Sequence, residues 1–398
     1  MSTIKTDEKL IDKFLTRGVA NIYPSKEALR LKLLSGDKIR AYQGFDPTGP
    51  YLHVGHAMGI RAMKILQQLG HEVIFLIGDF TARVGDPDKA KARDSLTIEQ
   101  VQKNMKGWKE QAAQLIDFEG NNPVQFKHNY DWLSKLKLEE LLELMSKATV
   151  QQMAERDLFS KRMKAGDPIQ LHEFIYPLMQ AYDGIEMNVD LEMGGTDQTF
   201  NMIMGRHLSK IYLNKEKFVR TNELMDAPDT LTMSKTKGNG INLSASANDM
   251  YGKAMSYPDD LITKGLRLLT DVALEDIWDI EKQIESGKNP MDFKKLMAFE
   301  ITKTIKGKSQ AEDAQKNFVK ITQHREIPQE LKEISTGSKT VLETAMLISE
   351  ESLSQTTRVI KQGGFSVNGE KITNPNQKLE NNRGDIIKVG KRNYGKIA

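Results

Sequence analysis

YQGFDPTGPYLHVGH, residues 42–56, lies between two segments that differ in hydrophobic period. KIRAYQGF before it alternates as a short strand does, whereas HAMGIRAMKILQQLG after it has the apolar spacing of a helix that ends at Gly70. A turn rich in glycine and proline joins the two. The segment therefore predicts a strand, a turn and a helix in that order.

His53 and His56 lie three residues apart where this helix opens, so their rings share one face. Free backbone N–H groups and the positive end of the helix dipole occupy the same place, which favours binding of a polyphosphate. Gly55 between them has no side chain and would let a nucleotide lie close to the backbone. The alternative is two histidines that only cap or pack against a helix end, because short motifs are weak by themselves.

EVIFLIGDF, residues 72–80, is an apolar run of strand length, typical of a strand buried on both faces of a parallel sheet. Strand, helix and strand at this spacing predict a βαβ unit. Ligands of such sheets bind outside the carboxyl ends of the strands, where TARVGDPDK and the turn of residues 42–56 both emerge. Neither segment carries GxGxxG or the phosphate-loop motif, so a nucleotide site here would be of another kind.

The remaining elements of the first 170 residues are mostly helical. We expect helices over residues 9–17, 26–34 (capped by Ser25) and 97–118, a short strand over 124–129, and two or three helices within 131–165.

LHEFIYPLMQAYDGIEM, residues 171–187, is predicted to be a helix with an unusual polar stripe. Tyr176, Gln180 and Asp183 lie at i, i+4 and i+7, which is one face of a helix. A phenol, an amide and a carboxylate in a row could line a polar pocket, where buried polar groups need partners. A solvated helix face is the alternative.

Residues 189–208 repeat the strand, turn and helix. Gly194 and Gly195 would let the backbone approach a ligand, and Asp197 at the helix start could accept from ribose hydroxyls. LTMSKTKGNGINL, residues 231–243, then predicts a mobile loop whose lysines could close over a phosphate. A surface loop with idle lysines is the alternative.

From residue 247 the chain is predicted to be helical to about residue 323, followed by a linker around Pro328. The tail contains a helix, LSQTTRVIKQGG, a hairpin around Asn368-Gly369 and a last strand, DIIKVGKRNYGKI. Residues 353–398 carry nine Lys/Arg and three Asp/Glu, a net charge of +6. This charge suggests a polyanion-binding module, and a charged, solvated β-domain is the alternative.

Composition sets the outer limits. The 398 residues are 39% hydrophobic and 28% charged, as in soluble globular proteins of two or three domains. The absence of cysteine excludes disulfides, thiol catalysis and thiolate zinc sites, and seven scattered histidines make a structural metal unexpected. No apolar run reaches about 18 residues, and the first residues form a charged amphipathic pattern without a signal core. We therefore expect a cytoplasmic enzyme that does not enter a membrane.

Four motifs in a fixed order resemble those of the bacterial tyrosyl-tRNA synthetases, a family of class I aminoacyl-tRNA synthetases. HVGH at 53–56 matches the HIGH signature and TMSKT at 232–236 matches the KMSKS loop. YPLMQAYD at 176–183 and GGTDQ at 194–198 match the tyrosine- and ribose-binding segments. The tail is similar to a small RNA-binding domain appended to many of these enzymes, so the resemblance covers essentially the whole chain.

The resemblance implies an α/β fold with a doubly wound parallel sheet, followed by an all-α domain and a small α+β RNA-binding domain. The expected boundaries are residues 1–245 for the Rossmann-like catalytic domain, 246–325 for the helical anticodon-region domain, 326–338 for a linker and 339–398 for the RNA-binding domain. A homodimer is expected from the family alone.

The implied activity is the ligation of L-tyrosine to tRNA(Tyr), with ATP as a substrate and Mg²⁺ on its phosphates. The substrate carboxylate is itself the nucleophile, so catalysis would come from positioning and from neutralising charge on the phosphates. The family pattern assigns catalysis to Thr48, His53, His56 and Lys235, and ATP binding to Gly44, Asp46, Gly55, Gly195, Asp197, Met233 and Lys235. It assigns tyrosine binding to Tyr42, Asp86, Tyr176, Gln180, Asp183 and Gln198, with Tyr42 and Asp183 on the phenol. It assigns RNA binding to Arg358, Lys361, Lys391 and Arg392.

Two departures from the family pattern stand out. Thr232 occupies the first position of the loop motif, where the signature has lysine, so Lys235 or Lys237 must supply the charge there. GGTDQTFN, with Glu192 before it, replaces the GGSDQWGN of many relatives and suggests a distinct bacterial subgroup. A tryptophanyl-tRNA synthetase, a catalytically inactive RNA-binding relative and a small-molecule nucleotidyltransferase remain alternatives.

Overall fold

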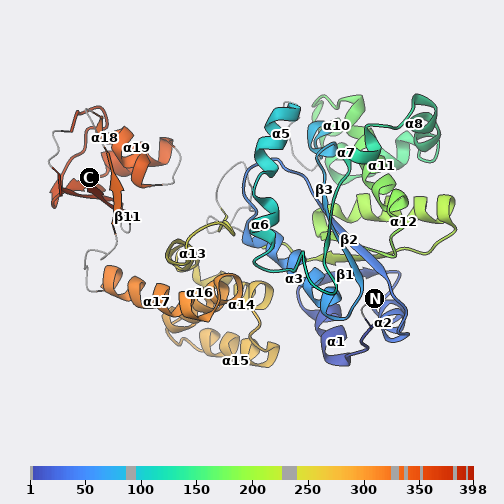
Figure 1. Cartoon of the computed structure of the whole chain (residues 1–398), viewed down its shortest axis with the longest axis horizontal. Helices are drawn as coiled ribbons and strands as arrows, with labels where there is room; N and C mark the ends of the chain where they lie inside the picture. The colour runs from blue at the N-terminus through green and yellow to red at the C-terminus, as the bar shows by residue number, and fades with distance from the viewer. Residues whose placement is uncertain are drawn as a thin grey trace. The chain divides into compact units, whose positions relative to one another are not determined.

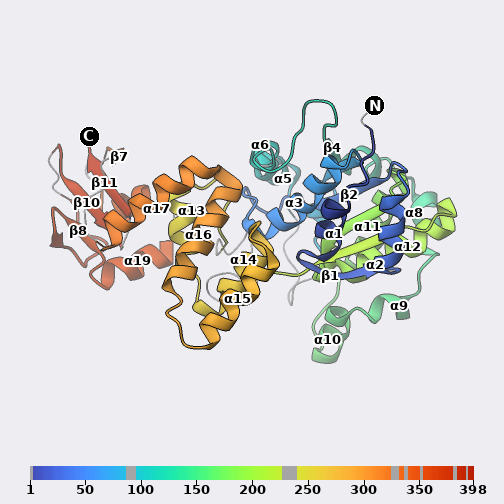
Figure 2. The same ribbon diagram turned by 90° about the horizontal axis from the view of Figure 1, so that it is seen from below.

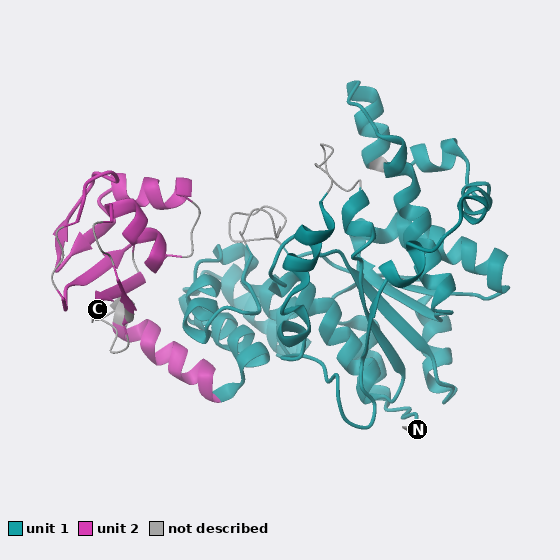
Figure 3. Ribbon diagram, turned by 45° about the horizontal axis from the view of Figure 1, so that its top comes forward, with its two compact units in different colours: residues 1–308 teal, residues 309–398 magenta. Residues whose placement is uncertain are grey.

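The computed structural model describes residues 3–86, 96–225, 240–323, 331–335, 339–349, 353–379, 383–390 and 393–398. It divides into two compact units, residues 1–308 and residues 309–398 (Figure 3). The three-domain organisation expected from the sequence has different boundaries and stays a prediction.

A six-stranded sheet forms the centre of the first unit (Figure 1). In spatial order its strands are β1 (Val19–Tyr23), β6 (Phe218–Asn222), β5 (Leu191–Gly195), β2 (Arg40–Phe45), β3 (Glu72–Ile77) and β4 (Gln125–His128). All neighbouring pairs are parallel except β1 with β6. The chain moves outward from β2 through β3 to β4, and then returns to the other side of β2 for β5 and β6. This reversal confirms the doubly wound sheet, whereas β1 was not predicted.

Two crossovers of this sheet run in opposite directions, from β2 to β3 and from β5 to β6. Because such crossovers are right-handed, their helices α3 (Val54–Gln68) and α12 (Thr199–Leu213) cover opposite faces. The remaining helices before α12 are α1 (Glu8–Thr16), α2 (Lys26–Leu34), α4 (Thr81–Val84), α5 (Ile98–Met105), α6 (Trp108–Ala112), α7 (Tyr130–Leu133), α8 (Leu138–Met145), α9 (Val150–Ala154), α10 (Asp157–Ala165) and α11 (Leu171–Glu186).

The single helix predicted over residues 97–118 is wrong. The chain breaks between α5 and α6 at Gly107, whose φ of 83° is left-handed and cannot continue a helix. The turn directs Trp108 into the core, where its side chain is fully buried. Burial of a large aromatic ring thus outweighs the helical period of the segment. The expected two or three helices within residues 131–165 are likewise four short ones.

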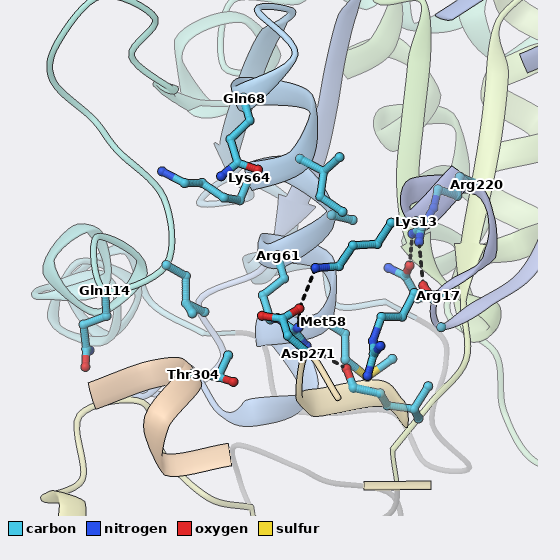
Figure 4. Close-up of a pocket in the computed structure, with 16 residues that line it drawn as sticks. Lys13, Arg17, Met58, Arg61, Lys64, Gln68, Gln114, Arg220, Asp271 and Thr304 are labelled. Atoms are coloured by element: carbon cyan, nitrogen blue, oxygen red, sulfur yellow. Dashed lines mark hydrogen bonds and ion pairs between the residues drawn. The ribbon is translucent and has the colours of Figure 1, made fainter. Parts of the chain in front are cut away.

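A helical layer follows the sheet in the first unit (Figure 2). It contains α13 (Ala247–Ala254), α14 (Ile262–Leu269), α15 (Leu274–Glu285) and α16 (Met291–Lys306). Figure 4 shows the cavity of about 210 Å³ at the junction of α1, α3, β6 and the end of α14. Arg61 donates to the carbonyl of Thr270 (2.7 Å) and Arg17 to that of Leu266 (2.9 Å). These arginines bind the carbonyl end of α14 and so attach the helical layer to α1 and α3.

The second unit contains α17 (Lys308–Gln323), two further helices and a five-stranded sheet. The elements are β7 (Lys332–Ile334), α18 (Val341–Ile348), α19 (Leu353–Lys361), β8 (Phe365–Val367), β9 (Glu370–Lys371), β10 (Ile386–Val389) and β11 (Asn393–Ile397). Asn368 and Gly369 both have positive φ, which confirms the hairpin between β8 and β9.

Two predictions for this region are wrong. The predicted linker contains β7, which pairs in parallel with β11. The predicted last strand is two antiparallel strands, β10 and β11, on either side of Gly390. In both places apolar side chains join a common core, so tertiary pairing decides the structure of residues whose local pattern is short. The core residues include Ile334, Val341, Ala345, Phe365 and Ile387.

His71 gives a pH test of the first unit. Its side chain is buried and its Nδ1 accepts from the backbone N–H of Ile39 (3.4 Å). Burial lowers the pKa of His71 from 6.5 to about 4, so the unfolded chain binds a proton that the native protein does not. We expect the free energy of unfolding to fall between pH 6.5 and pH 4 by up to about 3 kcal/mol. Urea titrations across this range should show that decline, and His71→Gln should flatten it.

Candidate active site

The carboxyl ends of the parallel strands meet at one edge of the sheet, and polar side chains follow each of them. Asp46 follows β2, Thr81 follows β3 and Asn129 follows β4. Thr81 Oγ1 donates to Asp46 Oδ1 (2.8 Å), and Asn129 Nδ2 donates to Thr81 Oγ1 (3.0 Å). This is the edge at which open α/β sheets bind ligands.

Helix α11 brings its polar stripe to the same edge. Tyr176 Oη donates to Asp46 Oδ2 (2.9 Å), and Asp183 Oδ2 accepts from Asn129 Nδ2 (3.1 Å). Tyr176 and Asp183 are buried, and Gln180 between them is half-buried. The alternative of a solvated helix face is therefore wrong, because the stripe finds its partners on the sheet.

Asp183 and Tyr42 lie in the buried part of this region. Asp183 Oδ1 accepts from Trp132 Nε1 (2.7 Å), so each carboxylate oxygen has a donor. The Tyr42 hydroxyl donates to the backbone carbonyl of Gln180 (3.4 Å). Burial raises the pKa of the Asp183 carboxyl well above its usual range, against the effect of its donors Trp132 and Asn129, and burial also raises that of Tyr42. A carboxylate and a phenol thus share one site that excludes water.

A buried ion pair between Glu192 and Lys217 holds the Gln180 side chain in place. Glu192 Oε1 accepts from Gln180 Nε2 (3.0 Å), and Glu192 Oε2 accepts from Lys217 Nζ (2.5 Å). Glu192 and Lys217 are 1% and 0% exposed. The ammonium lies against Gly205, where a Cβ atom would overlap it. Because a carboxylate only accepts, it directs the NH₂ of Gln180 toward itself and the amide oxygen away.

The amide oxygen of Gln180 begins a second branch of hydrogen bonds. Asn201 Nδ2 donates to Gln180 Oε1 (2.9 Å) and to Gln198 Oε1 (3.1 Å). Gln198 Nε2 donates to Asp86 Oδ2 (2.6 Å), and Arg156 Nη2 donates to Asp86 Oδ1 (2.7 Å). The structure therefore brings together three residues that the family pattern groups: Asp86, Gln180 and Gln198.

His53 is the N-cap residue of α3, and its backbone N–H donates to Nδ1 of His56 (3.0 Å). The two ring centroids are 3.8 Å apart. Since Nδ1 of His56 accepts a hydrogen bond, the neutral ring carries its proton on Nε2. The Nε2–H donor thus belongs to a ring in the first turn of α3, where the helix dipole favours an anion.

The segment after residue 239 is tied to this turn. Val54 N–H donates to the carbonyl of Ile241 (2.9 Å), and Leu243 N–H donates to that of Leu52 (2.8 Å). The exit of the predicted mobile loop thus pairs directly with the HVGH motif. The loop residues Thr232, Met233, Lys235 and Lys237 lie outside the described residues.

The remaining residues that the family pattern assigns lie on several different elements. Thr48 N–H donates to the carbonyl of Asp46 (2.8 Å), Gly55 lies in the first turn of α3, and Asp197 accepts from Gln198 (3.2 Å). Gly44 is the penultimate residue of β2, and Gly195 is the last residue of β5. Arg358 and Lys361 lie on α19 of the second unit, whereas Lys391 and Arg392 lie outside the described residues.

Sequence reasoning missed several residues of the network. Asn129 ends the predicted strand of residues 124–129, so its position at the ligand-binding edge was a usable signal. Lys217 gave none, because a lysine in a charged segment usually faces solvent. The missed residues are Thr81, Asn129, Trp132, Arg156, Asn201 and Lys217, whereas Glu192 was noted only as a departure from the family pattern.

Neither a membrane span nor a metal centre emerges from the part of the chain that the structure describes. None of its helices has the length and apolarity needed to cross a bilayer. Its His, Asp and Glu side chains form no group of three that could hold a metal ion.

Comparisons with known proteins agree with this architecture. Residues 34–323 match the family model described as tRNA synthetases class I (W and Y). The tyrosine–tRNA ligase of Thermotoga maritima is 39% identical over 97% of this chain and 96% of that protein. That of Dehalococcoides mccartyi strain CBDB1 is 38% identical over 98% of each. The truncated mitochondrial tyrosyl-tRNA synthetase of Aspergillus nidulans has the same fold, with a TM-score of 0.63 and 23% identity over 79% of this chain and 93% of that one. The chain therefore belongs to the class I tRNA synthetases of the W and Y family.

Proposed function

We propose that the chain is a tyrosine–tRNA ligase. The observation that carries this proposal is the buried Asp183 carboxylate beside Tyr42 at the ligand-binding edge of the sheet. The phenol hydroxyl of tyrosine needs both an acceptor and a donor once water is excluded, and these two residues supply them. An indole side chain has an N–H donor but no acceptor, so tryptophan would leave the Tyr42 hydroxyl without the acceptor that a phenol oxygen supplies.

The reaction has two steps. The carboxylate of L-tyrosine attacks the α-phosphorus of ATP, which forms tyrosyl-adenylate and releases pyrophosphate. A hydroxyl of the 3′-terminal adenosine of tRNA(Tyr) then attacks the carbonyl carbon, which releases AMP. No protein nucleophile is required, so the side chains act by positioning and by stabilising charge on the phosphates. ATP enters as its Mg²⁺ complex.

The roles follow the family pattern. Tyr42 and Asp183 would bind the phenol, and Asp46, Gly44, Gly55, Gly195, Asp197 and Met233 the ATP. Tyr176, Gln180, Asp86 and Gln198 would hold the ammonium, while Thr48, His53, His56 and Lys235 would act on the phosphates. Arg358, Lys361, Lys391 and Arg392 would bind tRNA backbone. We also propose a cytoplasmic homodimer, in keeping with the family and with the location of tRNA.

ATP–pyrophosphate exchange with tyrosine, phenylalanine and tryptophan offered separately tests the proposal. Exchange with tyrosine alone would support both the activation step and the pocket. Exchange with tryptophan would reassign the substrate, and no exchange with any of them would favour an RNA-binding relative without ligase activity.

His56→Ala is expected to slow the activation step by roughly 10²–10³-fold, because it removes a donor aimed at the phosphates. It also removes the acceptor of the His53 N–H, so the free energy of unfolding should fall by about 1 kcal/mol. Single-turnover formation of tyrosyl-adenylate and urea unfolding measure the two effects. His207→Ala, on α12, is the control, and an equal loss of rate there would count against the assignment.

A further inference from the structure

Arg156 reaches the candidate site from a segment that no motif covers. It is the N-cap residue of α10, and only 5% of it is exposed. Its Nη2 donates to Asp86 Oδ1 (2.7 Å), while the second oxygen of Asp86 accepts from Gln198. The guanidinium therefore lies next to the carboxylate that the proposed function assigns to the substrate ammonium.

Within the described part of the chain, the second terminal nitrogen of Arg156 has no hydrogen-bond partner. Nη1 is buried and makes no hydrogen bond to the residues that the structure describes. A buried donor on a charged group is costly to leave unpaired, so such atoms usually have a partner from protein, water or ligand. An anionic ligand group beside Asp86 would supply that partner.

A second buried arginine on α10 shows the contrast. Arg162 Nη1 and Nη2 both donate to the Glu173 carboxylate, and Nη2 also donates to the carbonyl of Pro168. Both terminal nitrogens of Arg162 are thus bound within the protein, as in a structural ion pair. In Arg156 only Nη2 is bound within the protein, to Asp86, so Nη1 can bind a ligand.

We propose that Arg156 binds the carboxylate of the tyrosine substrate through Nη1. This inference rests on the proposed function and deepens it. An α-amino acid presents its ammonium and its carboxylate on the same carbon, so its recognition needs an acceptor and a cationic donor side by side. Asp86 and Arg156 form such a pair, joined by the 2.7 Å hydrogen bond.

The chemistry of the first step is compatible with this contact. Nη1 donates to one carboxylate oxygen, and the other oxygen keeps its lone pair for attack on the α-phosphorus. The new C–O–P linkage forms as the bond to pyrophosphate breaks, and no proton or electron passes through Arg156. The bound oxygen becomes the carbonyl oxygen of the adenylate, so Arg156 orients the nucleophile.

Equilibrium binding of L-tyrosine and of tyramine, which lacks the carboxylate, tests the proposal. The unmodified protein is expected to bind tyrosine about tenfold to hundredfold more tightly than tyramine, the gain from one hydrogen bond to a charged group. In Arg156→Gln the two dissociation constants should agree within about threefold, with tyramine binding little changed. Arg156→Lys keeps a positive charge and should show an intermediate ratio, whereas Lys161→Gln, an exposed residue on the same helix, should keep the original ratio.

Three results would overturn the proposal. An equal loss of affinity for both ligands in Arg156→Gln would mean that Arg156 only positions Asp86. An unchanged ratio with slower pyrophosphate exchange would transfer the contact to the α-phosphate. Failure of the unmodified protein to bind either ligand would reject the proposed function itself, independently of Arg156. Thermal unfolding of each variant identifies any that is not folded.

Discussion

Asp183→Ala is expected to lower kcat/KM for tyrosine in pyrophosphate exchange by roughly 10²–10³-fold, while the value for phenylalanine changes little. The substitution removes the buried carboxylate that would accept from the phenol hydroxyl, so the hydroxyl would be desolvated without its charged acceptor. Phenylalanine has no hydroxyl and loses nothing. Tyrosyl-tRNA synthetases discriminate against phenylalanine by about 10⁵, which is a general property of the family.

The comparison that makes this result decisive is Glu186→Ala. Glu186 is an exposed carboxylate on the same helix, α11, and its loss should leave both substrates unaffected. Asp183→Ala also leaves the donors of Trp132 and Asn129 without their acceptor, so urea unfolding must accompany the kinetics. A folded Asp183→Ala protein that keeps the full discrimination between tyrosine and phenylalanine would show that Asp183 does not bind the phenol.

Lys217→Met is expected to reduce the free energy of unfolding by about 3–5 kcal/mol, because Glu192 would remain buried without its counter-ion. Both charges are almost fully removed from solvent, so water cannot replace the missing partner. Glu192→Gln should cost a similar amount by leaving the ammonium unpaired. The double variant Lys217→Met/Glu192→Gln removes both charges together and should recover most of the loss.

Urea unfolding of the four proteins gives a double-mutant cycle for this pair. Lys215→Met is the control, since Lys215 pairs with Asp190 at a half-exposed position and should contribute less than about 1 kcal/mol. Additive effects of the two single substitutions would contradict a buried, coupled pair. The double variant should also raise KM for tyrosine more than it lowers kcat, because a glutamine at 192 no longer enforces one orientation of the Gln180 amide.

These two experiments probe neighbouring positions, Asp183 and Gln180, of the same helix stripe. Asp183 accepts hydrogen bonds from Trp132 of α7 and from Asn129, the residue after β4. Gln180 donates to Glu192 of β5, and Lys217 neutralises the charge of Glu192. Each of these two polar groups is therefore held by residues from other elements. A site held in this way presents its polar atoms in one arrangement before the ligand arrives.

The amino-acid sequence alone was enough for the features that depend on local pattern. The turn at residues 42–56, the helical spacing of Tyr176, Gln180 and Asp183, and the apolar strands all follow from side chains near one another in the chain. Their order along the chain also predicted the βαβ unit, whereas the doubly wound sheet was expected from the family resemblance. Where burial competed with a local period, as at Trp108 and β7, the sequence prediction was wrong.

Only the tertiary structure decided which polar groups meet. Asp86 and Arg156 are 70 residues apart in the chain, and Glu192 and Lys217 are 25 apart, so no periodicity links either pair. These partners are selected by the cost of burying a charge or a donor alone, a cost that arises only once packing excludes water. The sequence therefore predicted the candidate residues of the reaction, whereas the fold determined what holds each of them in place.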